Sequence, residues 1–265
     1  MRWYFFKCLL FFSISIHTQS AVIIVHGTWA SDESWYQSCG DFFKSIQRVC
    51  IDQQIADYVI PFRWSGGLNF NSHRDAADQL VTIIDNYDFV ILISHSHGGT
   101  VAVLASQILA KKTQNFGKIK KLYILGMPVP YDMSIYPDMR VIQYCYNLFS
   151  FGDYVQRIGG MYTRAFIPHE RLANLAVRIH DWYPTHSGMH SPIIAKELLK
   201  IHDFFINHSN NSENFNFLQP AQITFFESDM PIYQAQLNQR ELLDIDLKVQ
   251  WMHQDAYRKK LRYAH

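Results

Sequence analysis

The stretch Ser94-His95-Ser96-His97-Gly98-Gly99 is the part of the sequence that most directly indicates the fold. It follows the apolar run of residues 88–93 and precedes a segment, residues 101–109, with apolar side chains at helical spacing. A strand, a sharp turn with a central serine, and a helix form the context in which a Gly-x-Ser-x-Gly-like match has meaning. Such a turn lifts the Ser96 hydroxyl clear of the sheet and points the helix N-terminus at whatever reacts there. The first glycine of the pattern is replaced here by Ser94.

Apolar runs and helical patterns alternate along the rest of the chain. We predict further strands at residues 21–26, 58–64, 119–125, 140–148 and 172–179, and further helices at residues 34–49, 72–87 and 191–205. This alternation predicts an α/β protein with a mostly parallel sheet and helices on both faces. Pro61 cannot donate a hydrogen bond within a sheet, so the strand at 58–64 is expected at an edge. Ser72 is expected to cap the helix that follows it.

The two ends of the chain differ from this pattern. Residues 1–20 carry Arg2 and Lys7, a short apolar stretch and a small-x-small site before Ala21, which predicts a signal peptide and an exported protein, secreted or periplasmic. Residues 21–207 then form the main domain, and residues 208–265 a linker and a small β-rich appendage. Within the appendage, residues 243–251 alternate between apolar and polar side chains, as a half-buried strand does. The appendage is also a candidate for peripheral contact with a membrane surface.

Net charge and the absence of metal-binding motifs argue against two kinds of partner. The formal charge of +1 gives no reason to expect a nucleic-acid partner. The sequence has no His-Glu-x-x-His motif and no paired-cysteine spacing, so we expect no metal. Cys39 and Cys50 either form a disulfide bridge or, with Cys145, remain free thiols, and both alternatives stay open.

Three polar residues occur in the order expected of a serine nucleophile and its helpers. A serine hydroxyl is a weak nucleophile that needs an adjacent base, which in turn needs an orienting acid. Asp153 follows the predicted strand at 140–148, and His190 lies in the loop before the last helix. The alternatives weighed for the two roles are Asp132, Asp138 and Asp181 for the acid, and His186 and His180 for the base.

From Ala21 to Asn207 the chain resembles the α/β-hydrolase family, in particular its lipase and esterase branch. The resemblance is carried by His26-Gly27, the 94–99 stretch, residues 147–156 and His190. It implies the α/β-hydrolase fold and a reaction without a cofactor.

The same resemblance assigns a role to each matching residue. It implies Ser96 as the nucleophile, Asp153 as the acid and His190 as the general base. It also implies an oxyanion hole made by the backbone N–H groups of Thr28 and His97.

The residues just beyond the predicted strand ends suggest a substrate cleft. They are His26, Trp29, Trp64, Met127 and Tyr131, which would suit an apolar acyl pocket or simply loop packing. We therefore expect an exported serine hydrolase that cleaves carboxylic esters of small molecules or lipids. The alternatives are a thioesterase or acyltransferase with the same three residues, and a non-catalytic binding protein on the same scaffold.

Overall fold

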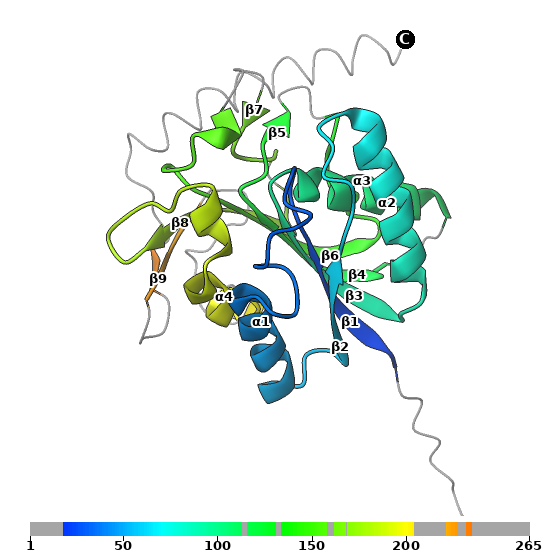
Figure 1. Cartoon of the computed structure of the whole chain (residues 1–265), viewed down its shortest axis with the longest axis horizontal. Coiled ribbons are helices and arrows are strands. Elements are labelled where there is room, and N and C mark those ends of the chain that lie inside the picture. The colour runs from blue at the N-terminus through cyan, green and yellow to red at the C-terminus, as the bar shows by residue number, and fades with distance from the viewer. Residues whose placement is uncertain are drawn as a thin grey trace, which may run out of the picture.

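The computed structural model of the chain describes residues 18–112, 116–130, 134–157, 162–167, 169–203, 221–226 and 232–234 (Figure 1). Its strands are β1 (Ser20–Val25), β2 (Tyr58–Phe62), β3 (Phe89–His95), β4 (Ile119–Leu125), β5 (Val129–Pro130), β6 (Ile142–Phe149), β7 (Tyr162–Thr163), β8 (Leu172–Ile179), β9 (Ala221–Phe225) and β10 (Ile232–Gln234). Its helices are α1 (Asp41–Asp52), α2 (Phe70–Asp85), α3 (His97–Lys112) and α4 (Pro192–Leu198), with short 3₁₀ turns η1 (Val155–Arg157) and η2 (Ser187–His190).

One large sheet runs through the molecule. Its strand order is β10-β9-β8-β6-β4-β3-β1-β2, and every neighbouring pair is parallel except β9 with β10. Strand β1 is buried along its whole length and pairs with β3 from Ser20 opposite Phe89 to Val25 opposite Ser94. Such continuous apolar strands are typical of parallel sheets that are covered on both faces.

The helices cover the sheet from two sides, as Figure 1 shows. Helices α2 and α3 pack together and contribute residues such as Leu80 and Val101 to one apolar cluster. Helices α1 and α4 pack on the other face, where Phe42 and Ile194 belong to a second cluster. The prediction of a mostly parallel sheet with helices on both faces is confirmed.

Two helices do not begin at the residues that the hydrophobic periodicity predicts. The helix expected at 34–49 begins only at Asp41, because the chain before it makes a tight turn in which a Cβ on Gly40 would lie 2.0 Å from the Ser34 carbonyl oxygen. Helix α2 begins at Phe70, and its N-cap is Asn69, whose side chain accepts a hydrogen bond of 2.8 Å from the Ser72 N–H. The prediction of Ser72 as the cap is therefore wrong. Ser191 caps α4 as predicted and accepts from the Ile194 N–H.

The edge position predicted for the Pro61 strand is confirmed. Within the described residues, β2 is the last strand of the sheet and pairs only with β1, where Pro61 lies opposite Ile24. The missing N–H of Pro61 therefore leaves no neighbouring strand without a donor.

The N-terminal boundary of the sheet lies one residue before the predicted cleavage point. Ser20 is the first residue of β1, and both its N–H and its hydroxyl donate to the Asp57 carboxylate, at 2.8 and 2.9 Å. Residues 1–17 of the predicted signal peptide lie outside the described residues.

The C-terminal boundary also differs from the prediction. Strand β9, expected in a separate appendage, pairs with β8 from Ala221 opposite Leu175 to Phe225 opposite Ile179. The main sheet therefore extends beyond the predicted domain boundary at residue 207. The predicted strand at 243–251 lies outside the described residues.

The structure decides between the two alternatives for Cys39 and Cys50. Cys39 is exposed, Cys50 is buried, and both are free thiols, so the structure has the unbridged alternative.

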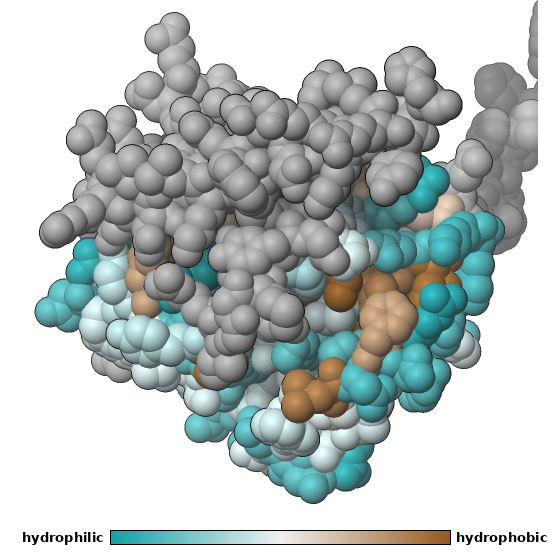
Figure 2. All heavy atoms as spheres, turned by 90° about the horizontal axis from the view of Figure 1, so that it is seen from above, coloured by the Kyte–Doolittle hydropathy of each residue, from teal (hydrophilic) through white to brown (hydrophobic). Residues whose placement is uncertain are grey.

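No described helix combines the length and apolar character needed to cross a bilayer. Seen from above, the described residues present small apolar areas within a mostly hydrophilic surface (Figure 2).

Candidate active site

Ser96 occupies a strained turn between β3 and α3. Its φ of 54° is in the left-handed region, which residues other than glycine seldom adopt. The glycines after it allow the close approach that holds this turn. A Cβ on Gly98 would lie 2.4 Å from the His26 carbonyl oxygen, and one on Gly99 would lie 2.8 Å from the Met127 sulfur. The strand, the turn and the helix therefore meet as the sequence pattern predicts.

Ser94 replaces the first glycine of the pattern without disturbing the turn. Its side chain is buried, and its hydroxyl donates a hydrogen bond of 3.2 Å to the Tyr123 carbonyl on strand β4. A buried hydroxyl is tolerated when it is paired in this way. Ser94 can therefore replace the glycine because its hydroxyl has a hydrogen-bond acceptor.

Asp153 lies in the turn between β6 and η1, and its carboxylate is fully buried. One carboxylate oxygen accepts from the backbone N–H groups of Val155 and Gln156, at 3.0 and 3.3 Å. The other is 2.7 Å from Nδ1 of His186. A buried carboxyl group needs such partners, and Asp153 has them in two backbone N–H groups and one imidazole ring.

The imidazole beside Asp153 therefore belongs to His186, and the prediction of His190 as its partner is wrong. His186 is the residue before the 3₁₀ turn η2, and His190 is the last residue of that turn. The His190 ring stacks on Trp35, with ring centroids 4.4 Å apart and planes 12° apart. The sequence placed both histidines in one loop but contained no signal for the turn that separates them.

The other candidates for the acid and the base take no part in the contact between Asp153 and His186 within the described residues. The Asp138 carboxylate pairs with the Arg140 guanidinium at 2.6 Å. Asp181 and His180 are exposed on the turn after β8. Asp132 lies outside the described residues.

Gly126 lets the strand ends approach one another. A Cβ on Gly126, which follows β4, would lie 3.0 Å from the Asp153 carboxylate and 3.5 Å from Nδ1 of His186. The preceding residue, Leu125, accepts a hydrogen bond of 2.9 Å from the Ser96 N–H. The end of β4 thus brings the serine turn, the carboxylate and the imidazole to one edge of the sheet.

The loops that carry Asp153 and His186 are also joined directly. The Ser150 hydroxyl donates to the Pro184 carbonyl at 2.6 Å, and a Cβ on Gly152 would lie 2.4 Å from the Tyr183 carbonyl oxygen. Arg164 donates to the carbonyls of Ser150 and Asp153, at 3.0 Å each. These contacts fix the two loops relative to each other, so the carboxylate and the imidazole keep their mutual position.

Thr28 and His97, the two residues of the predicted oxyanion hole, lie in contact. The Thr28 hydroxyl and Nδ1 of His97 are 2.9 Å apart. His97 is the first residue of α3, so its N–H has no acceptor within the helix. The positive end of the helix dipole adds to the attraction for negative charge beside Ser96.

Several histidines around Ser96 are held neutral. Burial lowers the pKa of His97 and of His190 to about 4, and lowers that of His95 well below its ordinary value. His186 differs from these rings in its partner, because its Nδ1 lies 2.7 Å from the Asp153 carboxylate. A carboxylate hydrogen-bonded to Nδ1 fixes the tautomer and the orientation of an imidazole ring.

These low pKa values predict acid-dependent stability. The unfolded chain binds protons on His190 near pH 6.5 and the folded chain only near 4, so the unfolded state gains protons first as the pH falls. We expect the free energy of unfolding to decrease from pH 7 to pH 5, with a contribution of roughly 2 kcal/mol from His190. In urea unfolding followed by circular dichroism, His190→Phe should lose correspondingly less stability over this interval. An equal loss in both proteins would contradict the prediction.

The residues predicted to line a cleft are mostly buried instead. Trp64 and Met127 belong to the apolar core between the sheet and α2–α3. Nε2 of His26 accepts from the Trp64 N–H, so its Nδ1 carries the proton and donates to the Gly27 carbonyl. With both ring nitrogens engaged, His26 supports the fold, and its placement in the cleft is wrong, as are those of Trp64 and Met127. Tyr131 lies outside the described residues.

Trp29 is the exception among the predicted cleft residues. Its side chain is 78% exposed, and its backbone is in the left-handed region with φ of 56°. The turn is held by a hydrogen bond of 3.0 Å from the Trp29 N–H to the Gly66 carbonyl. Tyr154, next to Asp153, is 77% exposed. Aromatic surface is thus available beside Thr28 and beside Asp153.

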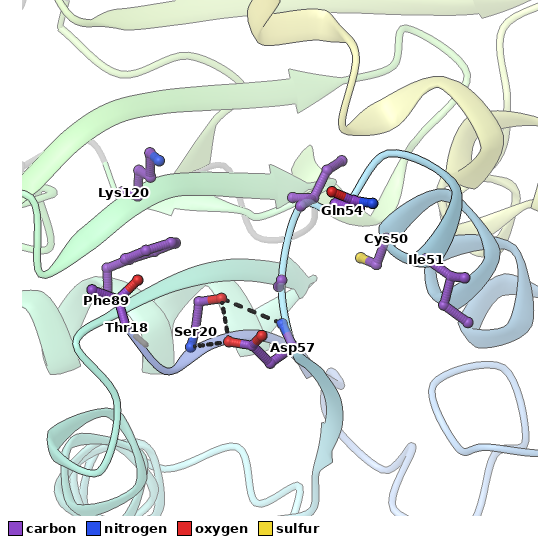
Figure 3. Close-up of a pocket in the computed structure, with 10 residues that line it drawn as sticks. Thr18, Ser20, Cys50, Ile51, Gln54, Asp57, Phe89 and Lys120 are labelled. Carbon is purple, nitrogen blue, oxygen red and sulfur yellow. Dashed lines mark hydrogen bonds between the residues drawn. The ribbon is translucent and has the colours of Figure 1, made fainter. Parts of the chain in front are cut away.

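A separate cavity lies at the opposite ends of the strands, where β1 and β3 begin. This cavity of about 550 Å³ is lined by Ser20, Cys50, Gln54, Asp57, Phe89 and Lys120, among others, and Figure 3 shows the bonds between Ser20 and Asp57 beside it. Ser20 and Phe89 begin β1 and β3, whereas Ser96 follows the end of β3, so the cavity is not part of the site described here. Within the described residues, no three His, Cys, Asp or Glu side chains gather in a way that could hold a metal ion.

Comparisons with known proteins place this geometry in context. The model of the Alpha/beta hydrolase family matches residues 22–200. Among curated proteins, no sequence matches the chain. Matching solved structures include an extracellular alpha/beta-hydrolase from a Paenibacillus species, described as sharing structural and functional homology with tobacco Salicylic Acid Binding Protein 2 (20% identity over 42% of this chain and 41% of that chain, TM-score 0.30).

Two further solved structures align over more of this chain. One is an alpha/beta hydrolase enzyme from the metagenome of sediments of the Mar Chica lagoon in Morocco (17% identity, 71% of this chain and 91% of that chain, TM-score 0.45). The other is lipase B of Aspergillus fumigatus (15% identity, 68% of this chain and 51% of that chain, TM-score 0.46). The chain spans 41% of the Paenibacillus protein and about half of the Aspergillus lipase.

Proposed function

This chain belongs to the alpha/beta hydrolase family, and on that premise we propose that it is a serine hydrolase of carboxylic esters, with Ser96, His186 and Asp153 as its catalytic residues. The observation that carries the proposal is the 2.7 Å contact between Nδ1 of His186 and the buried Asp153 carboxylate, at the sheet edge where Ser96 stands in its strained turn. A base oriented by an acid beside a serine in a strained turn is the arrangement that serine nucleophiles require.

The reaction follows from the roles of the three groups. The Ser96 oxygen attacks the ester carbonyl carbon while Nε2 of His186 takes its proton, and the N–H groups of His97 and Thr28 stabilise the oxyanion. The imidazolium then returns the proton to the departing alcohol, which leaves an acyl group on Ser96. Water, deprotonated by His186, releases the acid and restores the serine. Asp153 keeps the imidazole in the tautomer with the proton on Nδ1 throughout.

The acyl group is proposed to be apolar. Trp29 and Tyr154, both largely exposed, stand next to Thr28 and Asp153 in the chain and offer aromatic surface to such a group. Thioester or amide substrates would use the same residues, so the bond that is cleaved has to be decided by a substrate panel.

The test is covalent labelling of the intact protein with a fluorophosphonate probe, followed by tandem mass spectrometry of the adduct. We expect one adduct per chain, on Ser96, and turnover of p-nitrophenyl esters that rises from acetate to medium-chain acyl groups. Thioester and phospholipid substrates tested in parallel identify the bond that is preferred. An unlabelled protein that hydrolyses none of these esters would favour a non-catalytic binding protein on the same scaffold.

A further inference from the structure

We infer that His95 is a positioning residue for the catalytic base: its imidazole N–H holds the main chain of His186, and thereby the His186 ring, against Asp153. This inference rests on the proposed function, because it assigns His95 a task in the same reaction. His95 lies in β3 immediately before Ser96, so it connects the strand that carries the nucleophile with the loop that carries the base.

The contact itself determines which atom carries the proton. Nε2 of His95 lies 3.0 Å from the carbonyl oxygen of His186. A carbonyl oxygen can only accept, so Nε2 is the donor and the neutral ring has its proton there. The two imidazole rings also lie in contact, with centroids 4.6 Å apart.

The donor is held in a fixed direction by its neighbours. The His95 ring meets Trp35 edge to face at 5.6 Å and His190 edge to face at 4.8 Å, and Trp35 and His190 stack on each other. His95 is itself only 5% exposed. A ring confined from two sides can point its N–H at only one place, which is the property that a positioning group needs.

The position of His186 depends on such contacts because it lies outside regular structure. It follows the turn after β8 and precedes η2, where its carbonyl also accepts a bond of 3.3 Å from the Met189 N–H. In a catalytic base, a displacement of about 1 Å can cost on the order of 100-fold in rate. Burial also lowers the pKa of His95 well below its ordinary value, so the ring brings no positive charge next to the imidazolium that His186 must become.

Three substitutions separate hydrogen bonding from packing. His95→Phe keeps an aromatic ring against Trp35 and His190 but has no donor. His95→Gln loses the ring but carries an N–H at about the position of Nε2. His95→Asn carries the same amide on a side chain too short to reach the His186 carbonyl.

The experiment measures kcat and KM for a p-nitrophenyl ester and the rate of fluorophosphonate labelling in the full chain. We expect His95→Phe and His95→Asn to lower kcat and the labelling rate by about ten- to a hundredfold with KM unchanged, and His95→Gln to recover most of the loss. Thermal unfolding of each variant shows whether it is folded, and His95→Asn reports on the missing donor if His95→Phe does not fold.

Packing alone predicts the reverse order, with His95→Phe active and His95→Gln impaired, and that result would overturn the inference while the proposed function stands. Wild-type rates in His95→Asn would overturn it as well. A wild-type protein that is not labelled would overturn the proposed function, and the role of His95 with it.

Discussion

Ser96→Ala is expected to abolish ester hydrolysis and fluorophosphonate labelling, lowering kcat by on the order of 10⁶. The substitution removes only the hydroxyl oxygen, since alanine keeps the Cβ that packs against Gly27, and the backbone strain of the turn is the same. We therefore expect thermal stability close to that of the wild type. The measurement is the turnover of a p-nitrophenyl ester together with the labelling rate of the folded variant.

Ser94→Ala is the matched control for this experiment. Ser94 lies two residues earlier, and its hydroxyl is bound to the Tyr123 carbonyl. Its loss should lower the free energy of unfolding by about 1 kcal/mol and leave turnover intact. Retained labelling of Ser96→Ala at the wild-type rate would show that another residue is the nucleophile.

His186→Ala is expected to lower the rate of Ser96 acylation by on the order of 10⁶, because no other ring takes its place beside Asp153. His190→Phe should keep turnover within about tenfold of the wild type, since its ring stacks on Trp35 and has no role in proton transfer. The rate of fluorophosphonate labelling at neutral pH, measured on both variants, compares the two histidines directly.

A control in the same part of the chain is His180→Asn. His180 is exposed and has φ of 53°, a conformation that asparagine tolerates, so this variant should fold and react as the wild type does. The opposite result, an inactive His190→Phe with an active His186→Ala, would restore His190 as the base.

The sequence predicted the sheet well because its strands are long apolar runs. The predicted strands at residues 119–125 and 172–179 have the same bounds in the structure. Helix ends were less accurate, since a cap depends on local backbone geometry: Asn69 rather than Ser72 begins α2, and the turn at Gly40 delays α1. The sequence predicts β9 in an appendage because a linker-like composition precedes this strand, but β9 pairs with β8.

The candidate site was predicted in part. The sequence places Ser96 and Asp153 after strands, and parallel strands bring their carboxyl ends to one edge of the sheet. The sequence favours His190 over His186 as the base, and the role inferred for His95 has no signal in the sequence beyond its place next to Ser96. Trp64 and Met127 were misplaced because a residue just past a strand can turn either into the core or out of it.

The order of strands and helices, the serine turn and the glycines around it were determined by the sequence alone, because hydrophobic periodicity and the steric limits of tight turns are local properties of the chain. Which histidine meets Asp153 was decided only by the tertiary structure. His186 and His190 lie in one loop, and a single 3₁₀ turn packed against Trp35 directs one ring to the carboxylate and the other into an aromatic contact. That choice depends on contacts between segments far apart in the chain, which no local pattern records.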